Sequence, residues 1–226
     1  MWFVTGHQTS GRGRRGRAWE GPPGNLAASL FLTTEAPIDQ AVTLGFVAGL
    51  ALHDALSTFD LGGADIRLKW PNDVLANGGK LTGILLESES TGETRTAIVV
   101  GIGVNIVSAP EGVPFKAACL AGLGVSATAK QVFSALSDAW SARYAQWDAG
   151  RRARGGIEAI RSAWIERAFG IGGPVAVVSG SREIRGTFET LDSDGRLVVL
   201  KADGSRVSIS AGDVYFGDAA SAPAAG

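Results

Sequence analysis

Apolar residues in the first sixty positions form short runs and one longer periodic stretch. Residues 2–4 and 26–32 are compact apolar runs, which are typical of β-strands. Over residues 38–59 the apolar positions recur at helical spacing, which predicts a single helix with one buried face. Residues 6–24 are so rich in Gly and Pro that we expect one long loop there.

The middle of the chain alternates between apolar and charged residues. Residues 66–70 predict a half-buried strand that ends at Pro71. The Asn-Gly-Gly triplet at 77–79 is a strong turn signal, and further apolar strands are predicted over 81–87 and 97–106. Because no helical pattern separates these three strands, we expect them to form an antiparallel meander.

The second half of the chain changes from helices to short strands. Apolar residues between 133 and 147 stand three or four positions apart and predict a helix that stops at Gly150. Residues 157–164 predict a shorter helix. Beyond residue 173, Ser-Gly and Asp-Gly turns separate short apolar runs, which is the pattern of a small β-barrel. The strands predicted for it are 175–178, 184–191, 197–200 and 207–209.

These elements predict an α+β fold, with a mixed, largely antiparallel sheet packed with helices and a small C-terminal β-barrel. The expected catalytic or binding domain covers residues 1–172, and the barrel covers residues 173–217. Residues 218–226 are rich in Ala, Ser, Pro and Gly and are predicted to form a disordered tail.

The composition narrows the class of protein. Of the 226 residues, 45% are hydrophobic, which is ample for a buried core. Lys and Arg number 21 against 22 Asp and Glu, and the net charge of -1 gives no long-range attraction to nucleic acid or to an anionic membrane. No apolar run approaches the ~20 residues that span a bilayer. The single cysteine, Cys119, fits a reducing compartment, so we expect a cytoplasmic protein.

The first candidate for chemistry is the Arg-rich segment, residues 11–17, which reads Gly-Arg-Gly-Arg-Arg-Gly-Arg. Guanidinium groups suit carboxylate and phosphate oxygens, and glycines let a ligand approach the backbone, so the segment predicts an anion site. Its formal match to the dinucleotide fingerprint is weak, because the Gly-Pro-Pro-Gly run at 21–24 prevents the helix that the fingerprint requires. A solvated basic loop, or a nucleic-acid patch that uses Trp19, remains an alternative.

The second candidate combines the Lys-Trp-Pro-Asn-Asp run at 69–73 with Lys80 and Gly83 just beyond the predicted turn. A Lys–Asp pair across a hairpin can be an ordinary surface ion pair. It can also be an active-site pair in which the lysine neutralises developing negative charge. The third candidate is the Gly-Ile-Gly-Val-Asn run at 101–105, which also fits a core strand that ends in a turn-forming Asn.

These candidates occur in an order that resembles the biotin–protein ligase family. The resemblance rests on Gln8, on the Arg-rich segment with Trp19, and on residues 69–73, 80–85 and 101–105. It extends from residue 2 to about residue 216. It implies a catalytic domain of the class II synthetase and biotin ligase type, followed by an SH3-like barrel.

The resemblance implies a two-step reaction. Biotin and ATP, with Mg²⁺, first give biotinyl-5′-AMP and pyrophosphate. A specific lysine of a biotin carboxyl-carrier protein then takes the biotin and releases AMP. The carrier protein is therefore the implied partner, and a homodimer is possible. Lipoate or octanoate transfer on the same fold is an alternative, as is an inactive module that binds ligand or carrier protein.

The resemblance also implies roles for individual residues. The implied biotin-binding residues are Gln8, Gly11, Arg12, Gly13, Arg14, Trp19, Lys80 and Gly83. The implied nucleotide-binding residues are Arg14, Arg17, Asn72 and Asn105, of which Asn105 also faces the metal. The implied catalytic residues are Lys80, Arg14 and Asp73.

The chain departs from the family pattern at its beginning. In the family, a segment before the first strand carries a Ser-Thr-Asn-type motif that hydrogen-bonds the ureido group of biotin. Here Met1 stands at the start of that strand, so we expect a truncated catalytic domain with an uncovered first strand and missing biotin donors. Each unmet polar position would cost about 1–3 kcal/mol. A helix-turn-helix repressor domain has no room before Met1, so DNA binding is not expected.

Overall fold

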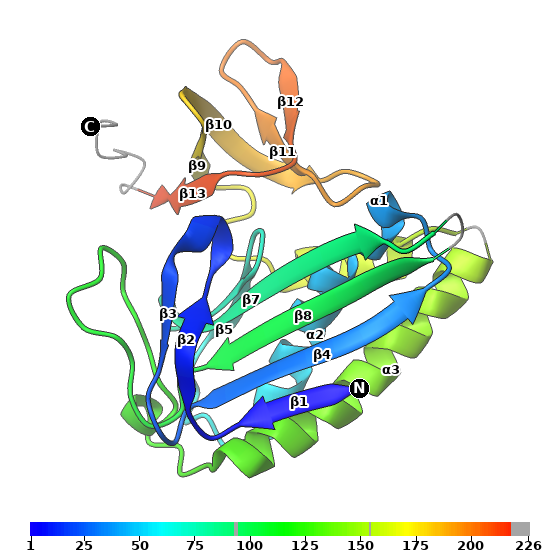
Figure 1. The fold of residues 1–226 in the computed structure, drawn as a ribbon. Helices are drawn as coiled ribbons and strands as arrows, with labels where there is room; N and C mark the ends of the chain where they lie inside the picture. Colours follow the sequence, from blue (N-terminus) through cyan, green and yellow to red (C-terminus); the bar gives the residue numbers. More distant parts are fainter. Residues whose placement is uncertain (93–94, 154, 218–226) are drawn as a thin grey trace.

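The computed structural model describes residues 1–92, 95–153 and 155–217. A six-stranded sheet lies over two long helices, and a smaller sheet stands beside it at one end (Figure 1). The α+β fold predicted from the sequence is therefore confirmed, with an antiparallel main sheet and a C-terminal β-unit. The tail predicted for residues 218–226 lies outside the described residues.

The main sheet contains the predicted meander with one additional strand. Its strand order is β1-β4-β8-β7-β6-β5, and every neighbouring pair is antiparallel. The additional strand, β6, pairs with both β5 and β7, and the turn at Asn77 and Gly78 joins β6 to β7. The strands are β1 (Trp2–Thr5), β4 (Leu26–Thr34), β5 (Ile66–Lys69), β6 (Asp73–Ala76), β7 (Gly79–Ser90) and β8 (Thr96–Val104).

The helices cover one face of this sheet. They are α1 (Ile38–Ala41), α2 (Leu44–Leu56), α3 (Ala129–Arg152) and α4 (Glu158–Glu166). The single helix predicted over 38–59 is wrong, because the chain tightens at Thr43, whose hydroxyl donates to the carbonyl of Gln40 at 2.6 Å. The prediction that the next helix stops at Gly150 is also wrong, since α3 continues to Arg152. Within the described residues, no helix has the length and apolarity needed to cross a membrane.

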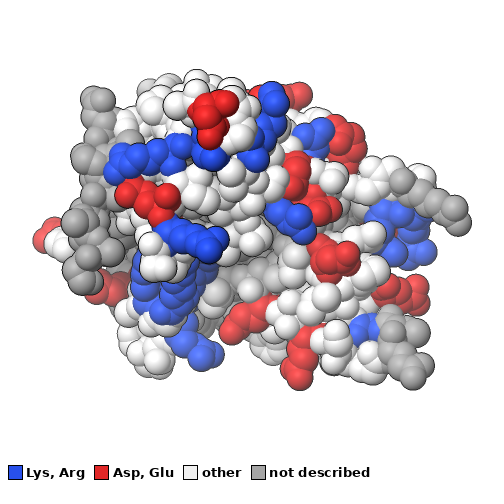
Figure 2. Space-filling model, turned by 90° about the horizontal axis from the view of Figure 1, so that it is seen from above, with Lys and Arg blue, Asp and Glu red and all other residues white. Residues whose placement is uncertain are grey.

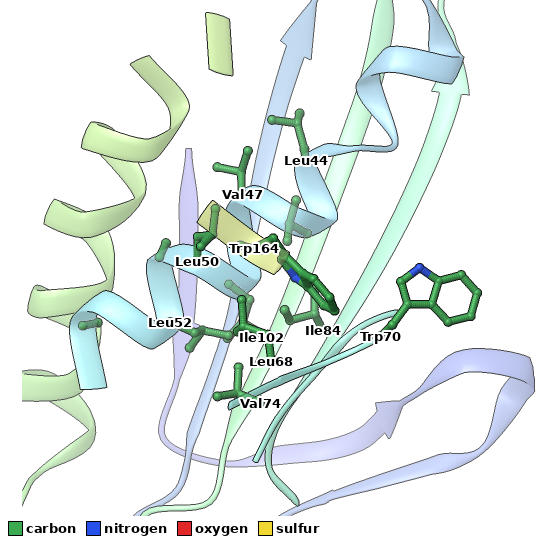
Figure 3. Close-up of a cluster of buried hydrophobic side chains, with 14 of the residues drawn as sticks. Leu44, Val47, Leu50, Leu52, Leu68, Trp70, Val74, Ile84, Ile102 and Trp164 are labelled. Atoms are coloured by element: carbon green, nitrogen blue, oxygen red, sulfur yellow. The ribbon is translucent and has the colours of Figure 1, made fainter. Parts of the chain in front are cut away.

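The core forms where α2 is enclosed between the sheet and the other helices. Figure 3 shows Leu50 of α2, Leu68 of β5, Ile84 of β7 and Trp164 of α4 meeting in one cluster. All of these side chains are buried, and burial of each contributes about 1.5–3 kcal/mol to folding. The opposite face of the sheet carries no such helical cover (Figure 1) and is free to hold a site.

The first strand is covered on one side only. Trp2 packs edge-on against Phe133 and Trp140 of α3, with ring centroids 5.5 and 6.2 Å apart. Phe3 points to the other face and is 56% exposed. The expectation of an uncovered first strand is therefore wrong for Trp2 and correct for Phe3.

Residues 6–24 form a hairpin, which corrects the loop predicted there. Strands β2 (Gln8–Arg12) and β3 (Ala18–Gly21) pair with each other, and a short 3-10 turn at Arg14–Gly16 makes the tip. Gly11 faces Trp19 across the pair, where a Cβ atom would overlap the Trp19 carbonyl oxygen. The glycine thus permits the close pairing that a larger residue would prevent. The hairpin stands over one end of the uncovered sheet face (Figure 1).

The C-terminal unit is a five-stranded antiparallel sheet in the order β12-β11-β10-β9-β13. Both predicted Asp-Gly turns join neighbouring strands there, and one additional strand, β13, follows the four predicted ones. The unit is docked by Trp70, whose indole nitrogen donates to the Gly195 carbonyl at 3.0 Å. The strands are β9 (Pro174–Ser179), β10 (Arg182–Leu191), β11 (Leu197–Leu200), β12 (Arg206–Ile209) and β13 (Asp213–Phe216).

An ion pair between helices predicts how stability depends on pH. Arg143 of α3 lies 2.6 Å from Asp54 of α2. Burial alone would raise the pKa of Asp54, but contacts with His53 and Arg143 lower it to about 2, from an ordinary 3.8. Because the folded-state pKa is lowered, the stabilisation is present above about pH 4 and is lost as the pH falls towards 2.

We therefore expect Asp54→Asn to reduce the free energy of unfolding at neutral pH and to flatten its decline between about pH 4 and 2. Urea titrations at several pH values measure this dependence. Asp65→Asn removes an exposed pair with Arg67 and serves as the control. An acid dependence as steep as that of the wild-type protein would contradict the prediction.

Candidate active site

The centre of the site is a tryptophan that rests on two glycines of the uncovered sheet face. Gly83 of β7 and Gly103 of β8 are cross-strand partners. A Cβ atom at Gly83 would lie 2.8 Å from the indole of Trp19, and one at Gly103 would overlap that ring. Glycine at both positions lets the indole lie directly on the sheet backbone. The hairpin and the main sheet thereby form one continuous wall.

Lys80 stands at the edge of this wall, paired with a carboxylate. Its ammonium nitrogen lies 2.8 Å from Asp73 Oδ1, and both side chains are largely buried. The same nitrogen lies 5.7 Å from the ring centre of Trp19 and 5.6 Å from that of Phe115. Aromatic faces attract a cation and hold it away from bulk water. The lysine charge is therefore both fixed in place and poorly screened.

Asn72 joins the hairpin tip to the sheet. Its side-chain nitrogen donates to the Ile84 carbonyl at 2.6 Å, and its oxygen accepts a hydrogen bond from Arg14 at 3.3 Å. Burial, followed by the neighbouring charge of Arg15, lowers the pKa of Arg14. Because the guanidinium is partly buried and has other arginines beside it, an added anion would be stabilised there.

Two charged residues of the site had no role in the sequence prediction. Lys69 lies with its ammonium 5.9 Å from the ring centre of Phe216, and burial lowers its pKa while Asp73 opposes that shift. Asp213 of β13 accepts hydrogen bonds from Arg15 and Arg17. Lys69 lies within the motif at 69–73, but Asp213 is about 200 residues distant from the segment that it contacts. No sequence pattern marks that pairing.

The remaining predicted residues fall into two groups: those on the hairpin, and Asn105, which is buried below the sheet surface. Gln8 lies close to Gly11, since a Cβ at Gly11 would lie 2.8 Å from Gln8 Oε1, and Arg12 is exposed on the same strand. Gly13 opens the 3-10 turn at the hairpin tip, where its amide donates to the Arg17 carbonyl at 2.7 Å. These residues line the hairpin, whereas Asn105 lies beneath the sheet surface. The structure thus brings most of the predicted residues together on one face.

Asn105 does not fit the role of a metal ligand in this arrangement. It is 2% exposed, and its side-chain nitrogen donates to the Ala118 carbonyl at 3.1 Å. Its side-chain oxygen is buried and has no hydrogen-bond partner among the described residues. A hydrated Mg²⁺ ion keeps several waters and needs open access. The described residues also hold no cluster of three or more His, Cys, Asp and Glu side chains.

The charges of the site suit two anions brought together. Five cations stand beside only two carboxylates, Asp73 and Asp213, so positive charge is in excess; the cations are Arg14, Arg15, Arg17, Lys69 and Lys80. Elsewhere on the face that includes the C-terminal sheet, basic and acidic side chains stand next to each other (Figure 2). Positive charge held in a partly dry site stabilises negative charge more strongly than it would in water. The arrangement can therefore hold a carboxylate against a phosphate.

Comparison with known families supports this chemistry. Residues 2–105 match the biotin/lipoate A/B protein ligase family, and residues 170–217 match the biotin protein ligase C-terminal domain. The chain is 38% identical over 218 residues to the biotin–[acetyl-CoA-carboxylase] ligase of Paracoccus denitrificans, a match that covers 96% of this chain and 90% of the relative. It is 35% identical over 220 residues to the ligase of the same description from Mycobacterium tuberculosis, with 94% and 77% covered.

The fold is similar to that of a solved protein. A biotin protein ligase from Aquifex aeolicus, solved in complex with biotin and ATP, superposes with a TM-score of 0.78 and 24% sequence identity. The superposition covers 96% of this chain and 89% of that protein. The main sheet, its helices and the C-terminal sheet therefore share one architecture with that enzyme.

Proposed function

The chain belongs to the biotin/lipoate A/B protein ligase family, and on that premise we propose that the cluster around Lys80 is where biotin and ATP meet. The protein is a biotin–protein ligase. It activates biotin with ATP to biotinyl-5′-AMP and transfers the biotin to a biotin carboxyl-carrier protein. The roles of single residues that follow are our proposal.

The observation that carries the proposal is the position of Lys80 between Trp19 and Phe115, beside Asp73. In the first step, the biotin carboxylate attacks the α-phosphorus of ATP and pyrophosphate leaves. Two anions must approach each other, so the barrier contains a large electrostatic repulsion. Lys80 and Arg14 are placed to offset this repulsion. Asp73 orients the Lys80 ammonium until the substrate oxygens replace it.

The hairpin supplies the walls for the substrates. Trp19, on Gly83 and Gly103, provides the apolar surface beside the biotin, and Gln8 with Gly11 lies at its end. Arg12 and Gly13 complete the proposed biotin-binding set, and Arg17 and Asn72 are proposed to hold the nucleotide. In the second step the carrier lysine attacks the activated carbonyl carbon and AMP leaves. Cover by the hairpin would keep water from the reactive anhydride.

Three finer points belong to the proposal. Mg²⁺ would arrive with the ATP phosphates, because Asn105 is buried and Asp73 is paired with Lys80. The proposed localisation is the cytoplasm, since the one cysteine, Cys119, is free and the reaction consumes ATP. Pairing of two copies would use a strand at the edge of the main sheet, and sedimentation tests whether it occurs.

Biotin-dependent exchange of labelled pyrophosphate into ATP tests the proposed function. We expect exchange with biotin and Mg²⁺, and little exchange with lipoate or octanoate in place of biotin. Exchange that prefers lipoate would assign the site to the related transfer reaction. Absence of exchange from a folded protein that still binds biotin would indicate a module without adenylation activity.

A further inference from the structure

The tip of the β2–β3 hairpin is tied to the C-terminal sheet at one carboxylate. Arg15 Nη1 and Arg17 Nη2 both donate to Asp213 Oδ2, at 2.9 and 2.7 Å. Asp213 is the first residue of β13, and it lies 198 positions from Arg15 in the sequence. The contact therefore connects the segment that covers the site with a sheet formed by the end of the chain.

The charges around the hairpin tip explain why a carboxylate is required there. Arg14, Arg15 and Arg17 lie within four positions of one another and repel each other. After burial, the charge of Arg15 is the largest influence that lowers the pKa of Arg14, whereas Asp213 and Asp73 oppose it. Without Asp213 the like charges at the tip would favour conformations that separate them.

The contact of Asp213 with the two arginines favours the ordered conformation of the hairpin tip but still allows the tip to open. The side chain of Asp213 is 25% exposed, and those of Arg15 and Arg17 are 44% and 65% exposed. Ion pairs with this exposure contribute little individually. Two of them on one oxygen can shift the balance between an ordered and an open tip without locking it.

We propose that Asp213 is a positioning residue for adenylation: it holds Arg15 and Arg17, and keeps the hairpin tip over the site before ATP binds. The inference rests on the proposed function, since Arg17 and the neighbouring Arg14 belong to the proposed nucleotide-binding set. Arg14, in the same hairpin tip, donates a hydrogen bond to the side-chain oxygen of Asn72. Because the tip is ordered in advance, less of the ATP binding energy is spent on ordering it.

Limited proteolysis tests the contact without relying on activity. Trypsin cleaves after arginine, so the cleavage rate at Arg15 and Arg17 in the full chain without substrates reports how often the tip opens. Asp213→Asn is expected to raise that rate about fivefold, and Asp213→Glu is expected to restore most of the protection. Equal melting temperatures would show that the variants are folded.

A matched control lies within the same sheet. Glu189 accepts two hydrogen bonds from Arg206, at 2.6 and 2.7 Å, and the side chains are 29% and 63% exposed, close to the values for Asp213 and Arg17. Glu189→Gln removes this pair without touching the hairpin, so neither the cleavage rate nor the KM for ATP is expected to change.

Kinetics separate positioning from a merely structural effect. In the exchange assay, Asp213→Asn is expected to raise the KM for ATP about fivefold and to change kcat by less than about twofold. A fall in kcat alone would reflect lost active protein and overturn the proposal. A lower KM would show that Asp213 competes with phosphate and would also overturn it. If the wild-type protein shows no exchange, the proposed function fails, whereas the trypsin result still decides the contact.

Discussion

Replacing Lys80 with alanine is expected to lower biotin-dependent pyrophosphate exchange by about 100- to 1,000-fold, the usual effect of removing one fixed group that stabilises a transition state. The ammonium lies 2.8 Å from Asp73 and faces two aromatic rings, so water would replace it poorly. The loss should appear mainly in kcat, because the two anions are pressed closest together and negative charge builds on the leaving pyrophosphate oxygen only in the transition state.

Lys116→Ala is the control for this variant. Lys116 lies on the segment that pairs alongside Lys80, but its ammonium donates to the Asn77 carbonyl at 2.7 Å and stays outside the cluster. It should retain nearly full exchange. If Lys80→Ala kept more than about a tenth of the wild-type kcat while remaining folded, the proposed role of Lys80 would be wrong.

Replacing Gly103 with alanine is expected to weaken biotin binding by about 10- to 100-fold. The added methyl group would occupy the space of the Trp19 indole, so the ring must leave the sheet surface. Overpacking of this kind costs about 1–3 kcal/mol, and here the cost falls on the wall that we assign to biotin. Isothermal titration with biotin measures the change, and the difference in near-ultraviolet circular dichroism between the variant and the wild-type protein reports the displaced ring.

The same strand offers a control. A Cβ at Gly101 would lie 3.6 Å from the Leu85 carbonyl oxygen, which is an ordinary contact, so Gly101→Ala should bind biotin almost as well as the wild-type protein. Equal losses from both alanine variants would show that the strand needs glycine for general backbone reasons. The loss would then not depend on the space that Gly103 leaves for the Trp19 ring.

The parts of the fold that follow from local patterns could be predicted. Alternation of apolar and charged residues located β5, and the Asn-Gly and Asp-Gly turns located the turn before β7 and the hairpins of the C-terminal sheet, whereas β6 was not predicted. The pairing of β2 with β3 could not be predicted, because Gly and Pro residues hide a strand signal and the pairing depends on Gly11 facing Trp19. The break at Thr43 depends on tertiary contacts, including a hydrogen bond from Trp147.

The candidate site shows the same division. The approach of Lys80 to Asp73 was predicted, since a turn separates them by only a few residues and brings them side by side. The depth of a residue cannot be read from the sequence, so the burial of Asn105, whose amide nitrogen donates to the Ala118 carbonyl, was not predicted. Contacts made by distant segments, such as Asp213 with Arg17, leave no trace in spacing or composition.

The anchoring of Trp70 makes the small C-terminal sheet a poor candidate for exchange as a module. Trp70 directly precedes the turn that carries Asn72 and Asp73, and its indole is fixed on Gly195. A side chain at Gly195 would overlap the ring of Phe46, and the residue has a φ of +77°. A chimaera would therefore keep its activity only if the donor sheet brought a glycine to this turn. Surface sequence in the transplanted unit could vary widely, whereas this one backbone position could not.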